Sequence, residues 1–243
     1  MSQNNNHKTI PKKQVLEIIN SGAKLHQEYT DFFEEELINN FIKRDRIYEL
    51  PNERFLYVFD EKGPFIRGKG IIYEKEYFLK FMRLIGEMRE DVIHRRTSAV
   101  SHWQFYSKHQ NNIVNLQEQL ITGLAAWLKI DEQKLDNSYA SLDLVSTACK
   151  QYDVKQLYEN LYDNLVFYVG EVIRKRVDGF WAINETHYGG LYPFITINVK
   201  HVQYMPVNVV LSALRDLNGI DLRKEAANEV RQNGWNAKQG LVK

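Results

Sequence analysis

A chain of 243 residues is long enough for one large domain or two modest ones, and its 44% hydrophobic residues can fill a buried core. Charged residues make up 26% and nearly balance, leaving a formal net charge of +1. This argues against a dedicated binder of nucleic acid or anionic membrane, because such proteins usually carry a basic excess. A single cysteine, Cys149, excludes an intramolecular disulfide framework and a multi-cysteine metal site.

No segment has the composition of a secretory signal or of a membrane-spanning helix. Residues 1–13 are polar, with an asparagine run at 4–6, and lack the apolar stretch of a signal peptide. No window comes near the ~18–20 consecutive apolar residues that a membrane helix needs. We therefore expect a cytoplasmic protein, which the scarcity of cysteine also favours.

The chain is predicted to begin with a disordered tail and two helices. Residues 1–10 are polar and without periodicity, which is typical of disorder. A first helix is predicted after Pro11, because apolar residues then recur at helical spacing. A second helix is predicted over residues 31–46, where acidic residues come early and basic residues late, as the helix dipole favours.

Strands and further helices are predicted to follow. Segment 54–60 is aromatic and β-branched, which favours a strand, and segment 71–73 favours another after a Gly-Pro turn. Apolar spacing then predicts helices over residues 74–92 and 113–128. We group these elements in a helical N-terminal part with a short hairpin, residues 11–132.

Residues 133–243 are predicted to form a C-terminal domain that begins with helices. Ser141 can cap a short helix that extends to residue 149. The clearest amphipathic segment of the chain follows, with an apolar stripe from Val154 to Val172, and Asp178-Gly179 breaks it.

The end of the chain is predicted to hold a hairpin and another helix. Segments 180–184 and 192–199 have strand composition and are joined by a polar, glycine-containing turn, which predicts a β-hairpin. Pro206 can begin the helix that follows, and a weaker helix is predicted over residues 221–232. The predicted fold is therefore α+β and helix-rich, with an N-terminal strand pair and a C-terminal helix–β-hairpin–helix unit. The two parts form separate domains or pack as one body.

A near-match to a phosphate-binding loop occurs at residues 63–70, where G-x-x-x-x-G-K spacing ends at Lys69. The next residue should be Ser or Thr, whose hydroxyl holds Mg²⁺, but it is Gly70. A helix should also begin at the lysine, whereas segment 71–73 is strand-like. These departures favour a hairpin connection over nucleotide binding at Lys69.

The histidines and the cysteine do not form a recognisable reactive or metal site. No H-E-x-x-H motif and no helical pair of histidines four residues apart is present. His102 and His109 could share a helical face, but no carboxylate completes a set around them. Cys149 is followed by a lysine, yet adjacent helical residues do not face each other, so we predict an inert thiol.

Glu171 is the strongest candidate for chemistry, because it lies in a helix that is apolar nearly all round. A carboxylate in such a place must be paired, hydrogen-bonded or protonated. One hypothesis is a general base with a raised pKa; the other is a structural ion pair with Arg174, or a hydrogen bond to Trp181 in the hairpin. The structural role is favoured, because one carboxylate without partner groups is not a catalytic site. The adjacent Gly170 is expected to allow close approach of another backbone.

Aromatic residues cluster around the predicted hairpin. Exposed members of such a cluster would mark a binding surface, and the candidate binding residues are Arg174, Trp181, Tyr188 and Tyr192. The alternation of residues 180–184 also predicts that about half of the cluster faces the core.

The last hundred or so residues resemble a class of uncharacterised bacterial α+β domains, some of which occur among immunity-type proteins. The resemblance is carried by Ser138-x-x-Ser141-Leu142, by the run from Gly170 to Arg174, by Gly179-x-Trp181 and by the helix at Pro206. It implies a bacterial helix–hairpin–helix domain and assigns no catalytic residue.

From these observations we expect a non-enzymatic protein-interaction module, in line with immunity-type proteins. The alternative is a small-molecule-binding protein or an enzyme that uses Glu171 as acid or base. The expected partner is another protein rather than nucleic acid or membrane, and no cofactor or metal is expected. Nothing in the sequence indicates an oligomeric state.

Overall fold

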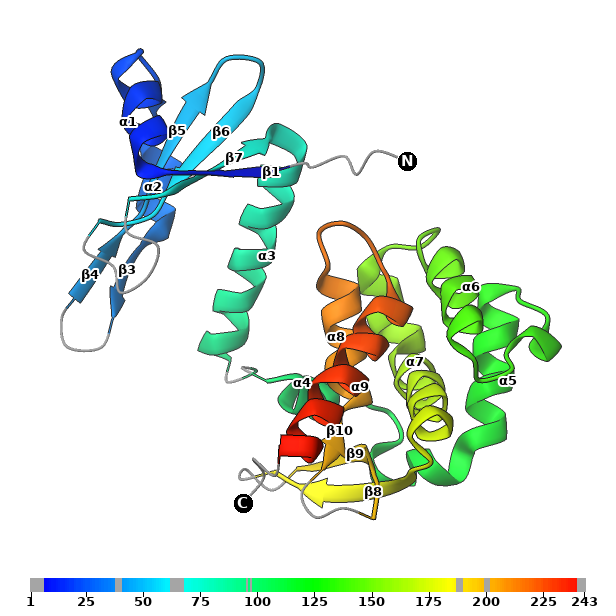
Figure 1. The fold of residues 1–243 in the computed structure, drawn as a ribbon. Coiled ribbons are helices and arrows are strands. Elements are labelled where there is room, and N and C mark those ends of the chain that lie inside the picture. Colours follow the sequence, from blue (N-terminus) through cyan, green and yellow to red (C-terminus); the bar gives the residue numbers. More distant parts are fainter. Residues whose placement is uncertain are drawn as a thin grey trace. The chain divides into compact units, whose positions relative to one another are not determined.

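The computed structural model describes residues 7–37, 41–61, 68–94, 96, 98–186, 190–198 and 202–239. The chain divides into two compact units, Met1–Glu87 and Met88–Lys243. Both units contain helices and antiparallel strands, which confirms the α+β class (Figure 1). The predicted boundary near residue 132 lies within the second unit.

The first unit is built on an antiparallel sheet with the strand order β1-β7-β6-β5-β2. Its strands are β1 (His7–Ile10), β2 (Lys24–Leu25), β5 (Arg46–Leu50), β6 (Arg54–Val58) and β7 (Gly70–Glu74). The other elements are α1 (Lys12–Asn20), α2 (Gln27–Phe33), the hairpin β3 (Glu34–Leu37) and β4 (Phe41–Arg44), and α3 (Lys75–Ile93), which continues into the second unit. The predicted strands at 54–60 and 71–73 are confirmed as β6 and β7, which pair along their length.

The two faces of this sheet carry different cores, because side chains alternate along each strand. On one face, Leu56 and Val58 of β6 pack with Val15 of α1. On the other face, Phe55 stacks on Phe78 of α3 with ring centroids 4.5 Å apart. The sheet is therefore covered by helices on both sides.

Two N-terminal predictions are wrong. Residues 7–10 of the predicted disordered tail form β1, because pairing with β7 orders the backbone and Ile10 is only 2% exposed. Residues 31–37 and 41–46 form the end of α2, the paired strands β3 and β4, and the start of β5 instead of one helix. The register places Glu34 opposite Arg44, so an acidic and a basic residue that would suit the two ends of a helix lie across from each other on neighbouring strands.

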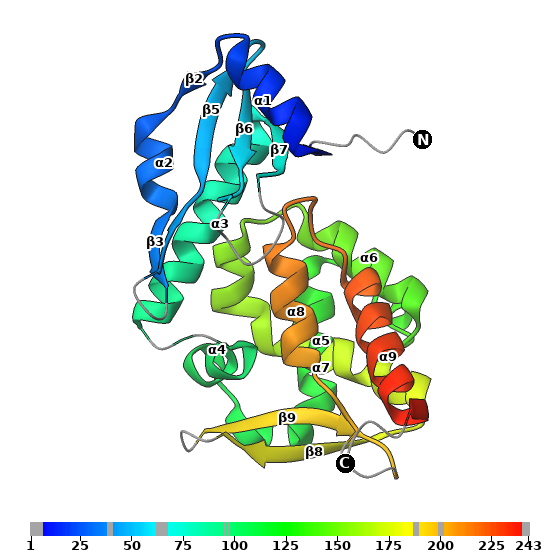
Figure 2. The ribbon, with the colours of Figure 1, turned by 60° about the vertical axis from the view of Figure 1, so that its left-hand side comes forward.

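The second unit is a helical body with a small sheet at one end, as Figure 2 shows. Its helices are α4 (Ala99–Tyr106), α5 (Gln117–Leu128), α6 (Tyr139–Cys149), α7 (Val154–Val177), α8 (Pro206–Arg215) and α9 (Leu222–Gln239), with short 3₁₀ segments at Gln110–Leu116 and Glu132–Lys134. Its strands are β8 (Phe180–Glu185), β9 (Leu191–Thr196) and the unpredicted β10 (Gln203–Tyr204), in the order β10-β9-β8. The predicted hairpin and the predicted helix at Pro206 are confirmed.

Helix α7 forms the centre of this unit and contacts α5, α6, α8 and α9. Its second half is buried without interruption from Leu165 to Ile173. It begins with a capping box at Asp153 and ends at Asp178, whose φ of 52° lies in the left-handed region, as the predicted helix break requires. Ser138, rather than the predicted Ser141, caps α6, because its side chain accepts the Ser141 N–H.

No helix among the described residues is long and apolar enough to cross a membrane.

Gly170 is required by the packing between α7 and β8. A Cβ at this position would overlap with the indole ring of Trp181 and would lie 3.1 Å from Cγ of Pro206. The close approach that the sequence predicted is therefore made by a side chain and not by a backbone.

We expect Gly170→Ala to lower the free energy of unfolding by about 3 kcal/mol, because overpacking outweighs the better helix propensity of alanine. Urea denaturation followed by circular dichroism measures this. Gly234→Ala is the matched control: a Cβ there meets nothing within 4 Å, so a stabilisation of up to about 1 kcal/mol is expected. Wild-type stability in Gly170→Ala would contradict the described contact with Trp181.

Candidate functional site

Three of the sequence-predicted residues, Glu171, Arg174 and Trp181, meet where α7 gives way to β8. Glu171 Oε1 accepts hydrogen bonds from Trp181 Nε1 at 2.6 Å and from Arg174 Nε at 2.9 Å. Its Oε2 accepts from Arg174 Nη2 at 2.9 Å. Glu171 is 1% exposed, so the guanidinium and the indole replace the water that its carboxylate would otherwise bind.

This geometry favours the structural hypothesis for Glu171. Both carboxylate oxygens are engaged by charged or polar donors of the same unit, and the Trp181 ring also stacks on Phe167 at 5.3 Å. A general base needs a lone pair directed at a substrate proton. The arrangement instead fixes the first residues of β8 to the last turns of α7.

The other predicted site residues do not join this group. Tyr192 lies on β9, half-buried, with its ring 5.9 Å from that of Phe194. Tyr188 lies outside the described residues. Lys69 is exposed and directly precedes β7, and its carbonyl accepts the Phe59 N–H at 2.9 Å, so this part of the near-match is a hairpin connection.

Cys149 agrees with the prediction of an inert thiol. It is fully buried at the end of α6, and burial raises the pKa of its thiol to about 12. The thiolate needed for nucleophilic attack is therefore suppressed at neutral pH.

A polar cluster that the sequence did not reveal is formed by Asp91, Arg96, His102 and Arg215. His102 Nε2 lies 2.6 Å from Asp91 Oδ2, and Arg215 Nη2 contacts the same oxygen. Arg96 Nε lies 3.4 Å from Asp91 Oδ1. The residues come from the last turns of α3, the segment before α4, α4 itself and α8, so no local spacing could have predicted this group.

The charges around His102 favour a neutral imidazole. Burial lowers the pKa of His102, and Arg215 and Arg96 act in the same direction, while Asp91 opposes them. Burial also raises the pKa of Asp91, but hydrogen bonds from His102 and Arg215 outweigh it, so this pKa falls below its usual value. A neutral His102 that donates its Nε2–H to Asp91 leaves Nδ1 as a buried acceptor without a partner among the described residues.

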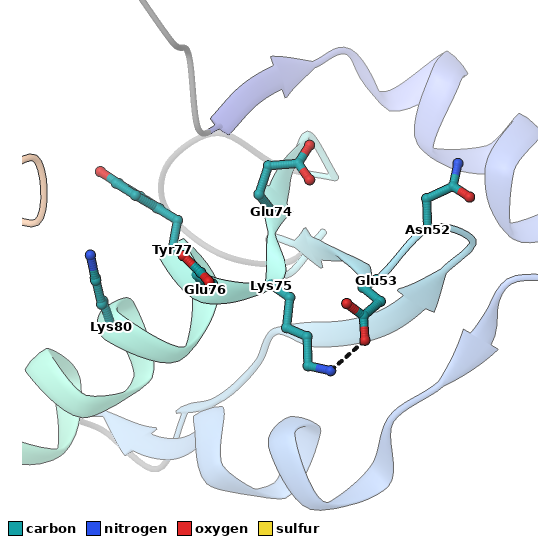
Figure 3. A pocket seen from close by; sticks show the side chains of 7 residues that line it. All are labelled: Asn52, Glu53, Glu74, Lys75, Glu76, Tyr77 and Lys80. Atoms are coloured by element: carbon teal, nitrogen blue, oxygen red, sulfur yellow. Dashed lines mark hydrogen bonds and ion pairs between the residues drawn. The ribbon is translucent and has the colours of Figure 1, made fainter.

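A pocket of about 290 Å³ lies in the first unit, at the β5–β6 turn and the start of α3 (Figure 3). Its lining includes Glu53 and Lys75, which point toward each other and form an ion pair at 2.7 Å, while Tyr77 and Lys80 point away from this pair. The pair is well exposed, and such pairs contribute little. The side chains that line this pocket do not converge on one point where a reacting atom could be held.

No group of three or more His, Cys, Asp or Glu side chains in the described part of the chain could hold a metal ion. Comparisons with models of protein families, with curated proteins and with solved structures give no match to this chain. The resemblance to immunity-type domains therefore stays a prediction, and function is inferred from the geometry.

Glu171→Gln is expected to lower the free energy of unfolding by about 2 kcal/mol, because it removes the charge from two buried donor–acceptor contacts. Chemical denaturation measures this. Glu159→Gln is the matched control on the exposed side of α7, and we expect it to change stability by less than about 0.5 kcal/mol. Equal stability of the two variants would exclude the structural role.

The lowered pKa of His102 predicts a pH dependence of folding. Below pH 6.5, the ordinary pKa of histidine, His102 takes up a proton more readily in the unfolded chain than in the folded chain. Wild-type stability should therefore fall as the pH decreases from 6.5. His102→Gln should flatten the slope of the unfolding free energy between about pH 6.5 and 5. An unaltered slope in His102→Gln would show that His102 is not held neutral.

Proposed function

We propose that this protein is a non-enzymatic interaction module that binds an extended segment of a partner protein along the outer edge of β8, which no other described strand covers. The observation that carries this proposal is the position of β8, which is the last strand in the order β10-β9-β8. Figures 1 and 2 both show it on the outer side of the helical body. A strand edge offers unpaired N–H and C=O groups, to which an added strand can bind.

The register identifies the groups on this edge. Antiparallel pairs alternate between hydrogen-bonded and non-hydrogen-bonded positions. The Thr186 N–H donates to Gly190 O at 2.6 Å, so Thr186 and every second residue before it face β9. Ile183 lies opposite Pro193, which has no N–H to donate, so this pair fits a non-hydrogen-bonded position in the alternation. The backbone groups of Trp181 and Ile183 therefore point away from β9.

The composition of β8 suits the binding of an added strand better than protection against one. Natural edge strands are often blocked by proline or lysine, and β8, with the sequence FWAINE, contains neither. Phe180 is 50% exposed at its start and supplies an apolar contact beside the edge. The bonds of Glu171 to Trp181 and Arg174 hold the strand in place before a partner arrives, which reduces the entropy lost on binding.

The sequence narrows the kind of partner. The resemblance of the C-terminal residues to bacterial immunity-type domains favours a toxin protein as the partner. The near-neutral charge disfavours nucleic acid, and the single buried cysteine is compatible with action in the cytoplasm. The alternative, an enzyme that uses Glu171 as acid or base, is weakened by the engagement of both carboxylate oxygens.

A proline at Ile183 tests the edge directly, because it removes an outward N–H and leaves the bonds to β9 intact. A partner captured from the native host, then purified, should bind wild type and the matched control Ile183→Ala with similar affinity in calorimetry. Ile183→Pro should weaken binding about tenfold or more. The Trp181 and Ile183 amides should also exchange hydrogen more slowly in the complex.

Two results would contradict the proposal. One is a specific partner whose affinity is the same for Ile183→Pro and Ile183→Ala. The other is a complex in which the amides of β8 exchange as fast as in the free protein.

A further inference from the structure

The second unit contains a pocket of about 170 Å³ beside the first half of α7. The residues that line it include Tyr106, Lys108, His109, Tyr158, Tyr162 and Asp163. The volume is several times the roughly 30 Å³ that one water molecule takes in the liquid. It can therefore hold a small organic group.

Asp163 brings an incompletely bonded carboxylate to this pocket. It is only 5% exposed, and its Oδ2 accepts hydrogen bonds from the Lys108 backbone N–H at 2.6 Å and the Ser107 hydroxyl at 3.3 Å. Its Oδ1 is buried and accepts no hydrogen bond from the described residues. A buried carboxylate with one oxygen that lacks a donor destabilises the free protein, and a positive charge on a ligand beside Asp163 reduces that cost.

Aromatic rings form the rest of the wall. The ring of Tyr158 lies 5.5 Å from that of Tyr106 and 5.4 Å from that of Tyr162. The faces of tyrosine rings attract cations and also pack against alkyl groups. A carboxylate among aromatic rings is the combination that recognises an ammonium or guanidinium group attached to a short chain.

We propose that this pocket binds a small organic cation, whose N–H groups pair with Asp163 and whose carbon atoms contact Tyr106, Tyr158 and Tyr162. An anion would be repelled by Asp163. Lys108 holds Asp163 through its backbone N–H, and Glu159 adds a second carboxylate to the lining of the pocket. This inference does not depend on binding at the β8 edge.

Binding should weaken as the pH falls, because protonated Asp163 cannot pair with a cation. Burial raises the pKa of Asp163, and the Lys108 N–H, His109 and Ser107 oppose this without reversing it. Tyr162, whose hydroxyl donates to Val207 O at 3.3 Å, stays neutral because burial raises its pKa far above the usual value. The loss of affinity should therefore begin at a higher pH than for an ordinary aspartate.

The test uses the full chain and two probes of equal shape, n-butylammonium and n-butanol, followed by amide NMR. We expect n-butylammonium to shift the Lys108 amide in a saturable manner, and n-butanol to bind about tenfold more weakly or worse. Asp163→Asn should weaken n-butylammonium binding by a similar factor. Asp143→Asn, at an exposed acid paired with Arg223, is the matched control and should leave binding unchanged.

A second pair of variants covers the case in which Asp163→Asn fails to fold. Tyr158→Phe keeps the aromatic face and should keep the affinity for n-butylammonium, whereas Tyr158→Leu should reduce it. Equal binding of n-butylammonium and n-butanol, unchanged affinity in Asp163→Asn, or the absence of a saturable shift in wild type would each overturn the proposal.

Discussion

The buried carboxylate of Glu171 is the interaction on which the second unit depends. It lies in α7, the helix that contacts most of the surrounding helices, and it bonds to Arg174 one turn later and to Trp181 at the start of the hairpin. A charge in such a place is tolerated only when its partners are supplied by the fold. Two further features follow from this bond: Gly170 must lack a side chain so that the indole can reach the carboxylate, and the helix must end at Asp178 so that the chain can turn back.

Sequence patterns predicted the elements whose signals are local. The apolar stripe of α7, its break at Asp178, the hairpin and the helix at Pro206 all follow from residue spacing and turn chemistry. The partners of Glu171 were also foreseen, because Arg174 is one turn away on the same helix and Trp181 lies at the start of the adjoining strand. Local order was therefore predictable, together with the contacts that join neighbouring elements.

Features that depend on distant parts of the chain were not predictable. Strand β1 is polar and is ordered by pairing with β7, more than sixty residues later in the chain. Residues 31–46 have a charge order that suits both a helix and a hairpin, and the pattern alone does not separate the two. The cluster around Asp91 joins residues 11 and 124 positions apart, so only the packing of α3, α4 and α8 brings them together. The Asp163 pocket is likewise assembled from α7, the end of α4 and the segment after it.

Pro193 has a consequence for how the protein can assemble with itself. It occupies the middle of β9, opposite Ile183, and the neighbouring β10 extends only over Gln203 and Tyr204. A strand added on the β10 side of the sheet would meet an edge of only two residues and then Pro193, whose backbone has no N–H to donate. Growth of the sheet is thus directional, and two copies that pair through β8 would close into a two-fold dimer whose outer edges resist further addition. Pro193 and the short β10 thereby limit open-ended growth of this sheet.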